Sequence, residues 1–399
     1  MSSPSFFGRL LKSGQFWALV VAGIGVLLGL FREFLIVKLL GFTNINDQLQ
    51  VYLSVVYVIS LFNEAVRLGA INMLHGVNLK QVAKIILPIG FGFAALSAIW
   101  MEVTLRPQSH FLLIGATVSG WLNMSVILLI TARQRSGKFW AAHLINVLNN
   151  LLLIPGILII GFVKPNDLVI PMAMLYFCLP LIQIPLLLMI RAEEPDIVFN
   201  PANQADGRKL MLTHSVSALG ALIFQGALRM NSLAVAEGEL SKVSIAIRIY
   251  DSIRFVIVDT FIGKKLADWK EKRDFSNIGR YMTAFFAVQG VTTLIAIGVA
   301  VGFQATLASL IILVLSLGSF GVRLVYIMFN TATINRKLIW NYGLQDVGVA
   351  VLLVTLSFAN LMTPAYLILA WYLVKPLWQM YTVRKAIDSH QFEPEEVPV

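Results

Sequence analysis

The chain has 399 residues, of which 58% are hydrophobic and only 13% are charged, and its mean hydropathy is +0.78. Soluble globular proteins have about 45–50% apolar and about 25% charged residues, so this composition excludes an ordinary soluble domain and predicts a membrane-embedded chain. The net charge of +10 does not indicate nucleic-acid binding, because in a membrane protein the placement of charge matters more than its total. The single cysteine, Cys178, excludes an internal disulfide and is expected to be a small buried residue.

Long apolar runs predict about twelve transmembrane helices, because about 20 apolar residues cross a bilayer as a helix. The predicted spans lie at residues 17–40, 50–72, 81–103, 109–132, 139–163, 168–190, 211–235, 243–263, 281–301, 304–330, 341–361 and 365–386. The first span is too long to be the apolar core of a signal peptide, so we expect it to remain in the mature protein. The predicted fold class is therefore an all-α polytopic membrane protein.

Basic residues predict the orientation of these spans. With the N-terminus in the cytoplasm, the cytoplasmic segments hold twenty Lys and Arg residues and the external loops hold four. This asymmetry is the positive-inside pattern, and it predicts that both termini are cytoplasmic.

The longest connection, residues 191–210, predicts a division into two halves. It is a charged, proline-containing cytoplasmic linker between a six-helix lobe at 1–190 and a second six-helix lobe at 211–388, and an acidic tail follows at 389–399. The lobes carry a short echo of each other, since Gly29-Leu30-Phe31-Arg32 in the first span matches Gly226-Ala227-Leu228-Arg229 in the seventh. Such internal repeats are typical of transporters and predict two pseudo-symmetric lobes.

Charged side chains inside the predicted spans are the candidate functional residues. A charge at the bilayer centre costs about 2.5–3.5 kcal/mol on insertion scales, so each needs a partner, water or a function. Nine of them are taken as candidates for a site, five basic and four acidic: Arg32, Arg229, Arg248, Arg254 and Lys375, with Glu33, Glu64, Asp251 and Asp259.

A cationic cavity between the lobes is the favoured interpretation. Guanidinium groups bind phosphate with two parallel hydrogen bonds, so Arg32, Arg229 and Arg248 would hold an anionic substrate. Two alternatives stay open. Arg248–Asp251 and Glu64–Arg67 have the i,i+3 spacing of structural ion pairs, and Lys375 would contact either the substrate or a buried carboxylate.

Enzymatic motifs are absent from the sequence. The five histidines have no metal-ligand spacing, and there is no Walker loop and no G-x-S-x-G elbow. We therefore expect a transporter, not an enzyme, without a cofactor or a bound metal. Transport energy would come from a Na⁺ or H⁺ gradient or from the membrane potential, which is worth about 2.3 kcal/mol per charge per 100 mV.

Three segments carry a family resemblance. They are Leu28-Gly29-Leu30-Phe31-Arg32-Glu33 leading to Asp47, then Gln134-Arg135-Ser136-Gly137-Lys138-Phe139, and Ala246-Ile247-Arg248-Ile249-Tyr250-Asp251. In this order they resemble the lipid II flippase family (MurJ/MviN). The resemblance implies the two-lobed fold of the multidrug, oligosaccharidyl-lipid and polysaccharide (MOP) exporters and alternating access. It also implies that Arg32 and Arg248 match cavity arginines and that Asp47 matches an aspartate of the second helix.

Departures from that family pattern bear on the substrate. Val26 stands where the family has a further arginine, Val58-Ile59-Ser60-Leu61 stands where it has a basic pair, and about twelve spans are predicted instead of fourteen. The leading hypothesis is therefore a flippase for a polyprenyl-pyrophosphate-linked oligosaccharide of capsule, exopolysaccharide or O-antigen in the bacterial inner membrane. Glycosyltransferases and a polymerase would be its partners, and Asp251 and Asp259 would orient the arginines or couple to cations.

Four alternatives stay open: a lipid II flippase, a cation-coupled drug or metabolite antiporter, a membrane glycosyl polymerase, and a scaffold without transport activity. A cationic cavity counts against cationic drugs, and the short external loops count against a polymerase.

Overall fold

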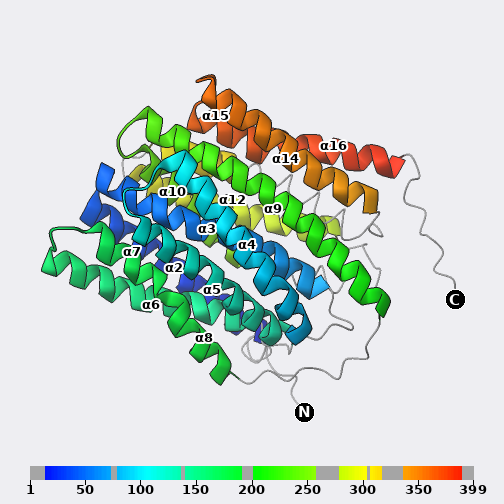
Figure 1. The fold of residues 1–399 in the computed structure, drawn as a ribbon, viewed down its shortest axis with the longest axis horizontal. Coiled ribbons are helices and arrows are strands. Elements are labelled where there is room, and N and C mark those ends of the chain that lie inside the picture. The colour runs from blue at the N-terminus through cyan, green and yellow to red at the C-terminus, as the bar shows by residue number, and fades with distance from the viewer. Residues whose placement is uncertain are drawn as a thin grey trace, which may run out of the picture. The chain divides into compact units, whose positions relative to one another are not determined.

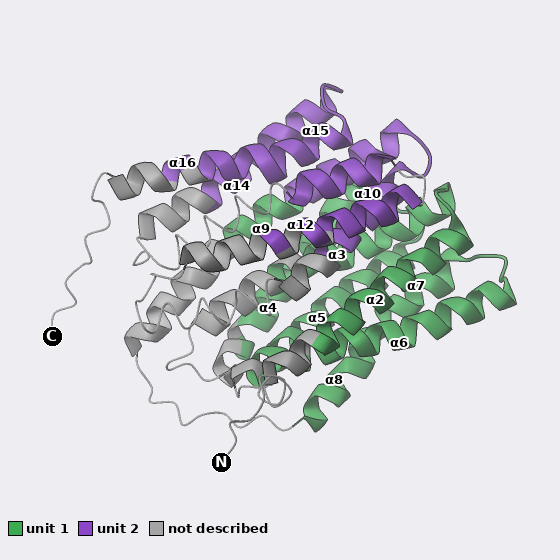
Figure 2. Cartoon of the chain, turned by 180° about the vertical axis from the view of Figure 1, so that it is seen from behind, with its two compact units in different colours: residues 1–222 green, residues 223–399 purple. Residues whose placement is uncertain are grey.

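A computed structural model describes residues 14–72, 79–135, 140–190, 201–257, 278–302, 306–316 and 336–388. It divides the chain into two compact units, residues 1–222 and 223–399 (Figure 2). The described residues form helices and connecting turns without any strand, so the predicted all-α fold class is confirmed. Residues 191–200 of the predicted linker and the predicted tail 389–399 lie outside the described residues, whereas 201–210 are the first turns of a helix.

Unit 1 is a bundle of helices lying alongside one another (Figure 1). Its helices are α2 (Gly14–Leu40), α3 (Asn44–Asn72), α4 (Leu79–Leu105), α5 (His110–Arg135), α6 (Trp140–Val163), α7 (Val169–Phe177), α8 (Leu179–Met189) and the first part of α9 (Pro201–Val235). Helix α2 packs mainly against α6, and α5 packs against α3 and α4. The unit thus places residues of α2 beside residues more than a hundred positions later in the chain.

Unit 2 contains the second part of α9 and a chain of shorter elements. These are α10 (Glu239–Ile257), α12 (Ile278–Gly302), a helix at Thr306–Ser316, α14 (Arg336–Phe358), α15 (Pro364–Leu369), the π-helical turn η2 (Ala370–Val374) and α16 (Lys375–Asp388). Helix α10 packs against α12, and α14 packs against α16. The last three elements follow one another without a break.

Local sequence explains where several helices begin and end. Gly41 has a φ of +67°, a left-handed conformation that favours glycine, and its N–H donates to the Val37 carbonyl as α2 ends. Thr363 caps α15 through its hydroxyl, which accepts from the Tyr366 N–H, and Pro364 occupies the first helical turn. The end of α8 is instead capped from another helix, because the guanidinium of Arg133 on α5 donates to the carbonyls of Leu187 and Ile190.

Close packing inside unit 1 depends on a small residue at one crossing. A Cβ on Gly120 of α5 would lie 2.5 Å from Ile59 Cδ1 of α3, which is closer than side chains tolerate. Asn63 of α3 donates to the Gly120 carbonyl at 3.3 Å, so an amide reinforces the same crossing. Small residues and interhelical amides are the usual means of association in a membrane, where apolar burial supplies little.

Large apolar side chains cover the outer surface. Phe162 is 89% exposed, Met189 82% and Val103 66%. Six of the described helices are long and apolar enough to cross a membrane. Exposed apolar surface on this scale suits lipid and not water, so the chain is a multi-pass membrane protein. A described helix overlaps each predicted span, while the number of twelve and the orientation of the termini stay predictions.

Cys178 does not follow the expectation of a buried residue. It lies at the junction of α7 and α8 and is exposed. A thiol is apolar enough to face lipid there, which the sequence pattern could not distinguish from packing inside the bundle.

Candidate functional site

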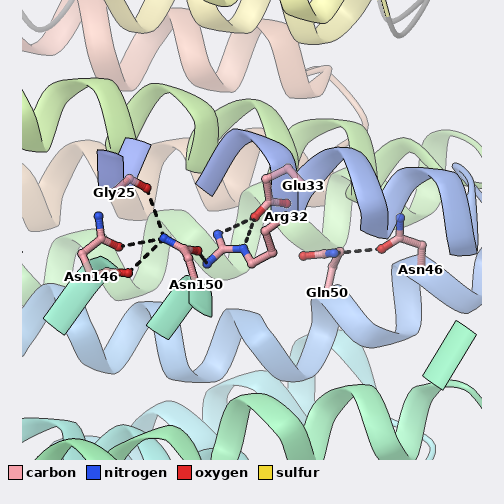
Figure 3. A network of polar contacts seen from close by, with 7 residues as sticks. All are labelled: Gly25, Arg32, Glu33, Asn46, Gln50, Asn146 and Asn150. Carbon is pink, nitrogen blue, oxygen red and sulfur yellow. Dashed lines mark hydrogen bonds and ion pairs between the residues drawn. The ribbon is translucent and has the colours of Figure 1, made fainter. Parts of the chain in front are cut away.

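Arg32 of α2 lies at the centre of a polar network in unit 1 (Figure 3). Its Nη2 donates to Glu33 Oε1 at 2.6 Å, and its Nε donates to the same oxygen at 3.1 Å. The Arg32 side chain is 14% exposed and that of Glu33 is 2% exposed. A buried carboxylate thus holds the guanidinium of a partly exposed side chain in one orientation.

Asn150 of α6 fixes the other side of the guanidinium. Its Oδ1 accepts from Arg32 Nη1 at 3.0 Å, and its Nδ2 donates to the carbonyls of Gly25 at 3.1 Å and Asn146 at 3.0 Å. The close approach at Gly25 makes this possible, because a Cβ there would lie 2.9 Å from Asn146 Nδ2. The amide therefore links the backbone of α2 to that of α6 and to the Arg32 side chain.

The hydrogen-bond capacity of Arg32 is only partly used. A guanidinium has five N–H donors, and within the described part of the chain three of them donate, two to Glu33 and one to Asn150. The guanidinium carbon also lies 5.9 Å from the centre of the Tyr176 ring of α7. Two oriented donors on a partly exposed cation are suited to phosphate oxygens.

The start of α3 lies beside this network. Asn46 donates to the Gly41 carbonyl at 2.7 Å. Gln50 donates to Asn46 at 2.8 Å (Figure 3). Asp47 is 2% exposed in the first turn of α3, where the partial positive charge of a helix N-terminus stabilises a carboxylate. Asp47 is thus positioned by the start of its helix.

Lys375 forms a second charged cluster, in unit 2. Its Nζ donates to Asp346 Oδ1 of α14 at 2.8 Å and lies 3.6 Å from the centre of the Trp371 ring. Gln379 Nε2 donates to the same Asp346 oxygen at 2.8 Å. Two roles were left open for Lys375, and the structure shows it paired with a buried carboxylate.

Arg229 lies in a third group, also in unit 2. It is 3% exposed and donates to the side-chain oxygen of Gln225 and to the Gln225 carbonyl one helical turn earlier. Gln225 in turn donates to Tyr372 Oη at 3.2 Å. Phe224 stacks on Trp371 with ring centres 4.5 Å apart. Helix α9 therefore contacts η2, the turn that leads directly into Lys375.

The other predicted residues are less well defined. Arg248 and Asp251 are partly exposed on α10, where Ile247, Ile249 and Tyr250 are buried. Asp259 and the side chains of Glu64 and Arg254 lie outside the described residues. Arg32 belongs to unit 1 and Arg229, Arg248 and Lys375 belong to unit 2, so the predicted cavity shared by the lobes stays a prediction.

Sequence reasoning missed three residues that the structure makes central: Asn150, Asp346 and Gln379. Each is polar, lies within a predicted span and is at most 2% exposed. The signal for Asn150 was its i,i+4 spacing from Asn146, and the signal for Gln379 was the same spacing from Lys375. Within the described chain, no group of three or more His, Cys, Asp or Glu side chains is arranged to hold a metal ion.

Comparison with known proteins identifies the fold. No family model and no curated protein sequence matches the chain. Its structure resembles that of the lipid II flippase MurJ in an inward closed conformation, with a TM-score of 0.64 and 13% identity over 93% of this chain and 87% of that one. It also resembles a MOP superfamily transporter from Pyrococcus furiosus, with a TM-score of 0.53 and 14% identity over 97% and 99% of the two chains.

These likenesses confirm the fold implied by the sequence resemblance. The chain has the fold of MOP superfamily transporters, and the two neighbours are described as a flippase and a transporter.

Proposed function

We propose that the chain is a flippase that moves a polyprenyl-pyrophosphate-linked oligosaccharide across the bacterial inner membrane by alternating access. The observation that carries this proposal is the Arg32 network, because it holds a guanidinium in a fixed, partly exposed position with two N–H donors left over. A pyrophosphate accepts hydrogen bonds from such donors with high directional specificity.

The roles of the network follow from its geometry. Glu33 and Asn150 orient Arg32 before substrate arrives, so little ordering remains to be done on binding. In the second lobe, Arg229, Arg248 and Arg254 are the proposed further contacts, and Arg229 is 3% exposed in this structure. Arg229 would become accessible only in another state of the transport cycle.

Coupling of transport to an ion gradient is the second part of the proposal. The carboxylates of Glu33, Asp47, Glu64, Asp251 and Asp259 would orient the arginines or exchange Na⁺ or H⁺ with the solution. The substrate would come from membrane glycosyltransferases and pass to a polysaccharide polymerase, as surface polysaccharide synthesis requires.

A lipid II flippase is the second candidate, favoured by the fold match to a protein of that name. Lipid II shares the polyprenyl-pyrophosphate group, so the same arginines would serve it. The two candidates differ in the headgroup that is attached to the pyrophosphate.

Reconstitution into vesicles tests the substrate class. Purified protein would be placed in liposomes with one of three probes: a fluorescent polyprenyl-pyrophosphate oligosaccharide, fluorescent lipid II or a cationic dye. We expect the oligosaccharide probe to become accessible on the opposite leaflet faster than in protein-free vesicles. Faster movement of lipid II would establish the second candidate, and movement of the dye alone would contradict both.

A further inference from the structure

Asp346 and Trp371 hold one position in unit 2 from two sides, and Gln379 holds the Asp346 carboxylate. The Lys375 ammonium occupies that position, 2.8 Å from Asp346 Oδ1 and 3.6 Å from the centre of the indole ring. The side chains of Lys375 and Asp346 are 9% and 3% exposed. A carboxylate and an aromatic face are the two groups that bind ammonium ions most strongly in proteins.

Gln379 adds a polar atom whose bonding is incomplete. Its Nε2 donates to Asp346, which fixes the orientation of the amide, because the opposite orientation would place two oxygens against each other. The residue is 1% exposed, and its Oε1 accepts no hydrogen bond from the described residues. A buried carbonyl oxygen in this state is an available ligand for a cation or a donor.

The backbone at this point departs from the α-helix. Ala370–Val374 form a π-helical turn, and the Lys375 N–H donates to the Ala370 carbonyl as the turn closes. Pro376 follows and has no N–H of its own. Single π-helical turns inside α-helices are frequent at functional sites. This one contains Trp371 and ends directly before Lys375.

We propose that Asp346, Gln379 and Trp371 form a binding site for a small monovalent cation of the primary ammonium type, and that Lys375 fills it as a tethered occupant. The ammonium remains attached to the chain, so the site holds a cation without taking one from solution. The inference does not rest on the proposed transport function.

Removal of the tether gives a direct test. Lys375→Ala deletes the ammonium and three methylene groups, which together match propylammonium. We expect propylammonium chloride at tens of millimolar to raise the melting temperature of the purified variant by about 3 °C or more, because a ligand that binds only the folded state stabilises it. Wild-type protein should show no such rise, because its site is filled.

Matched variants separate specific binding from a solvent effect. Lys375→Met fills the same volume without charge, and Lys375→Ala combined with Asp346→Asn removes the carboxylate. Neither should respond to propylammonium, and propanol should not stabilise Lys375→Ala. An equal response in the double variant, or no response in Lys375→Ala, would overturn the proposal.

A second comparison covers the case in which Lys375→Ala does not fold. Lys375→Met removes the ammonium that Asp346 binds, and adding Asp346→Asn removes the charge of the carboxylate. The double variant should melt at a higher temperature than Lys375→Met alone. A double variant that melts no higher than Lys375→Met would show that Asp346 needs no cation, and the proposal would fail.

Discussion

The Arg32 network of unit 1 and the Lys375 cluster of unit 2 are both built on a buried carboxylate, yet they leave their cations in different situations. Arg32 is held by Glu33 and Asn150 but keeps two N–H donors and 14% exposure. Lys375 lies between Asp346 and the face of Trp371, with its side chain 9% exposed. A charge in a membrane helix can therefore be either partly exposed beside its partners, as at Arg32, or buried between a carboxylate and an aromatic face, as at Lys375.

Breaking the buried Lys375–Asp346 pair should have the largest effect on stability. Asp346→Asn leaves the Lys375 ammonium buried without its counter-ion, which costs about 3–5 kcal/mol of unfolding free energy. Thermal or denaturant unfolding of the purified protein measures this cost. Glu239→Gln is the matched control, because it removes the more exposed Glu239–Lys242 pair, in which the groups lie 3.3 Å apart, and should cost no more than about 1 kcal/mol. Equal costs for the two variants would show that Asp346 does not hold Lys375 in place.

Removing the amide that presents Arg32 should have the next largest effect. Asn150→Ala deletes an acceptor for Arg32 and a donor to the α2 backbone, which we expect to cost about 1–3 kcal/mol of stability. It should also slow transport, because Arg32 would lose its fixed position.

Asn149→Ala is the control for that variant. Asn149 lies next to Asn150 on α6 and accepts from Gln183 of α8 at 2.6 Å, whereas the amide that accepts from Arg32 is that of Asn150. Its loss should lower the melting temperature without a specific effect on transport. If both variants transport equally at equal melting temperature, Asn150 does not position Arg32.

The smallest effect on stability should come from changing the aromatic ring of Trp371. Trp371→Phe keeps a ring beneath the ammonium but weakens its cation–π attraction, for an expected loss of about 0.5–1 kcal/mol. Trp378→Phe changes a half-exposed indole on α16 and should be nearly neutral in the same unfolding measurement. An equally neutral Trp371→Phe would show that Asp346, and not the indole ring, holds Lys375 in place.

The helical fold follows from the sequence to a large extent, because bilayer thickness fixes the length of an apolar run and a described helix overlaps each of the predicted spans. The rule that buried charges need partners also singled out Arg32, Glu33 and Lys375. Those predictions depend on local sequence alone.

The partners were harder to predict, because they depend on helix packing. Asn150 lies 118 residues from Arg32, and its contact exists only because α2 and α6 approach closely at Gly25. Asp346 is 29 residues from Lys375 on another helix. Spacing rules reach only three or four residues along a helix, so such pairs need the tertiary structure.

The presentation of Arg32 to an anionic lipid headgroup is the central claim, and the initial flipping rate of purified Arg32 variants in vesicles tests it most directly. With the fluorescent polyprenyl-pyrophosphate oligosaccharide, Arg32→Ala should flip about 10- to 100-fold more slowly than wild type, since a hydrogen bond to a charged group is worth about 1.5–3 kcal/mol. Arg32→Lys should keep part of the rate, and Lys38→Ala, which removes an exposed charge from the same helix, should keep all of it. A folded Arg32→Ala variant that flips the probe at the wild-type rate would contradict the claim.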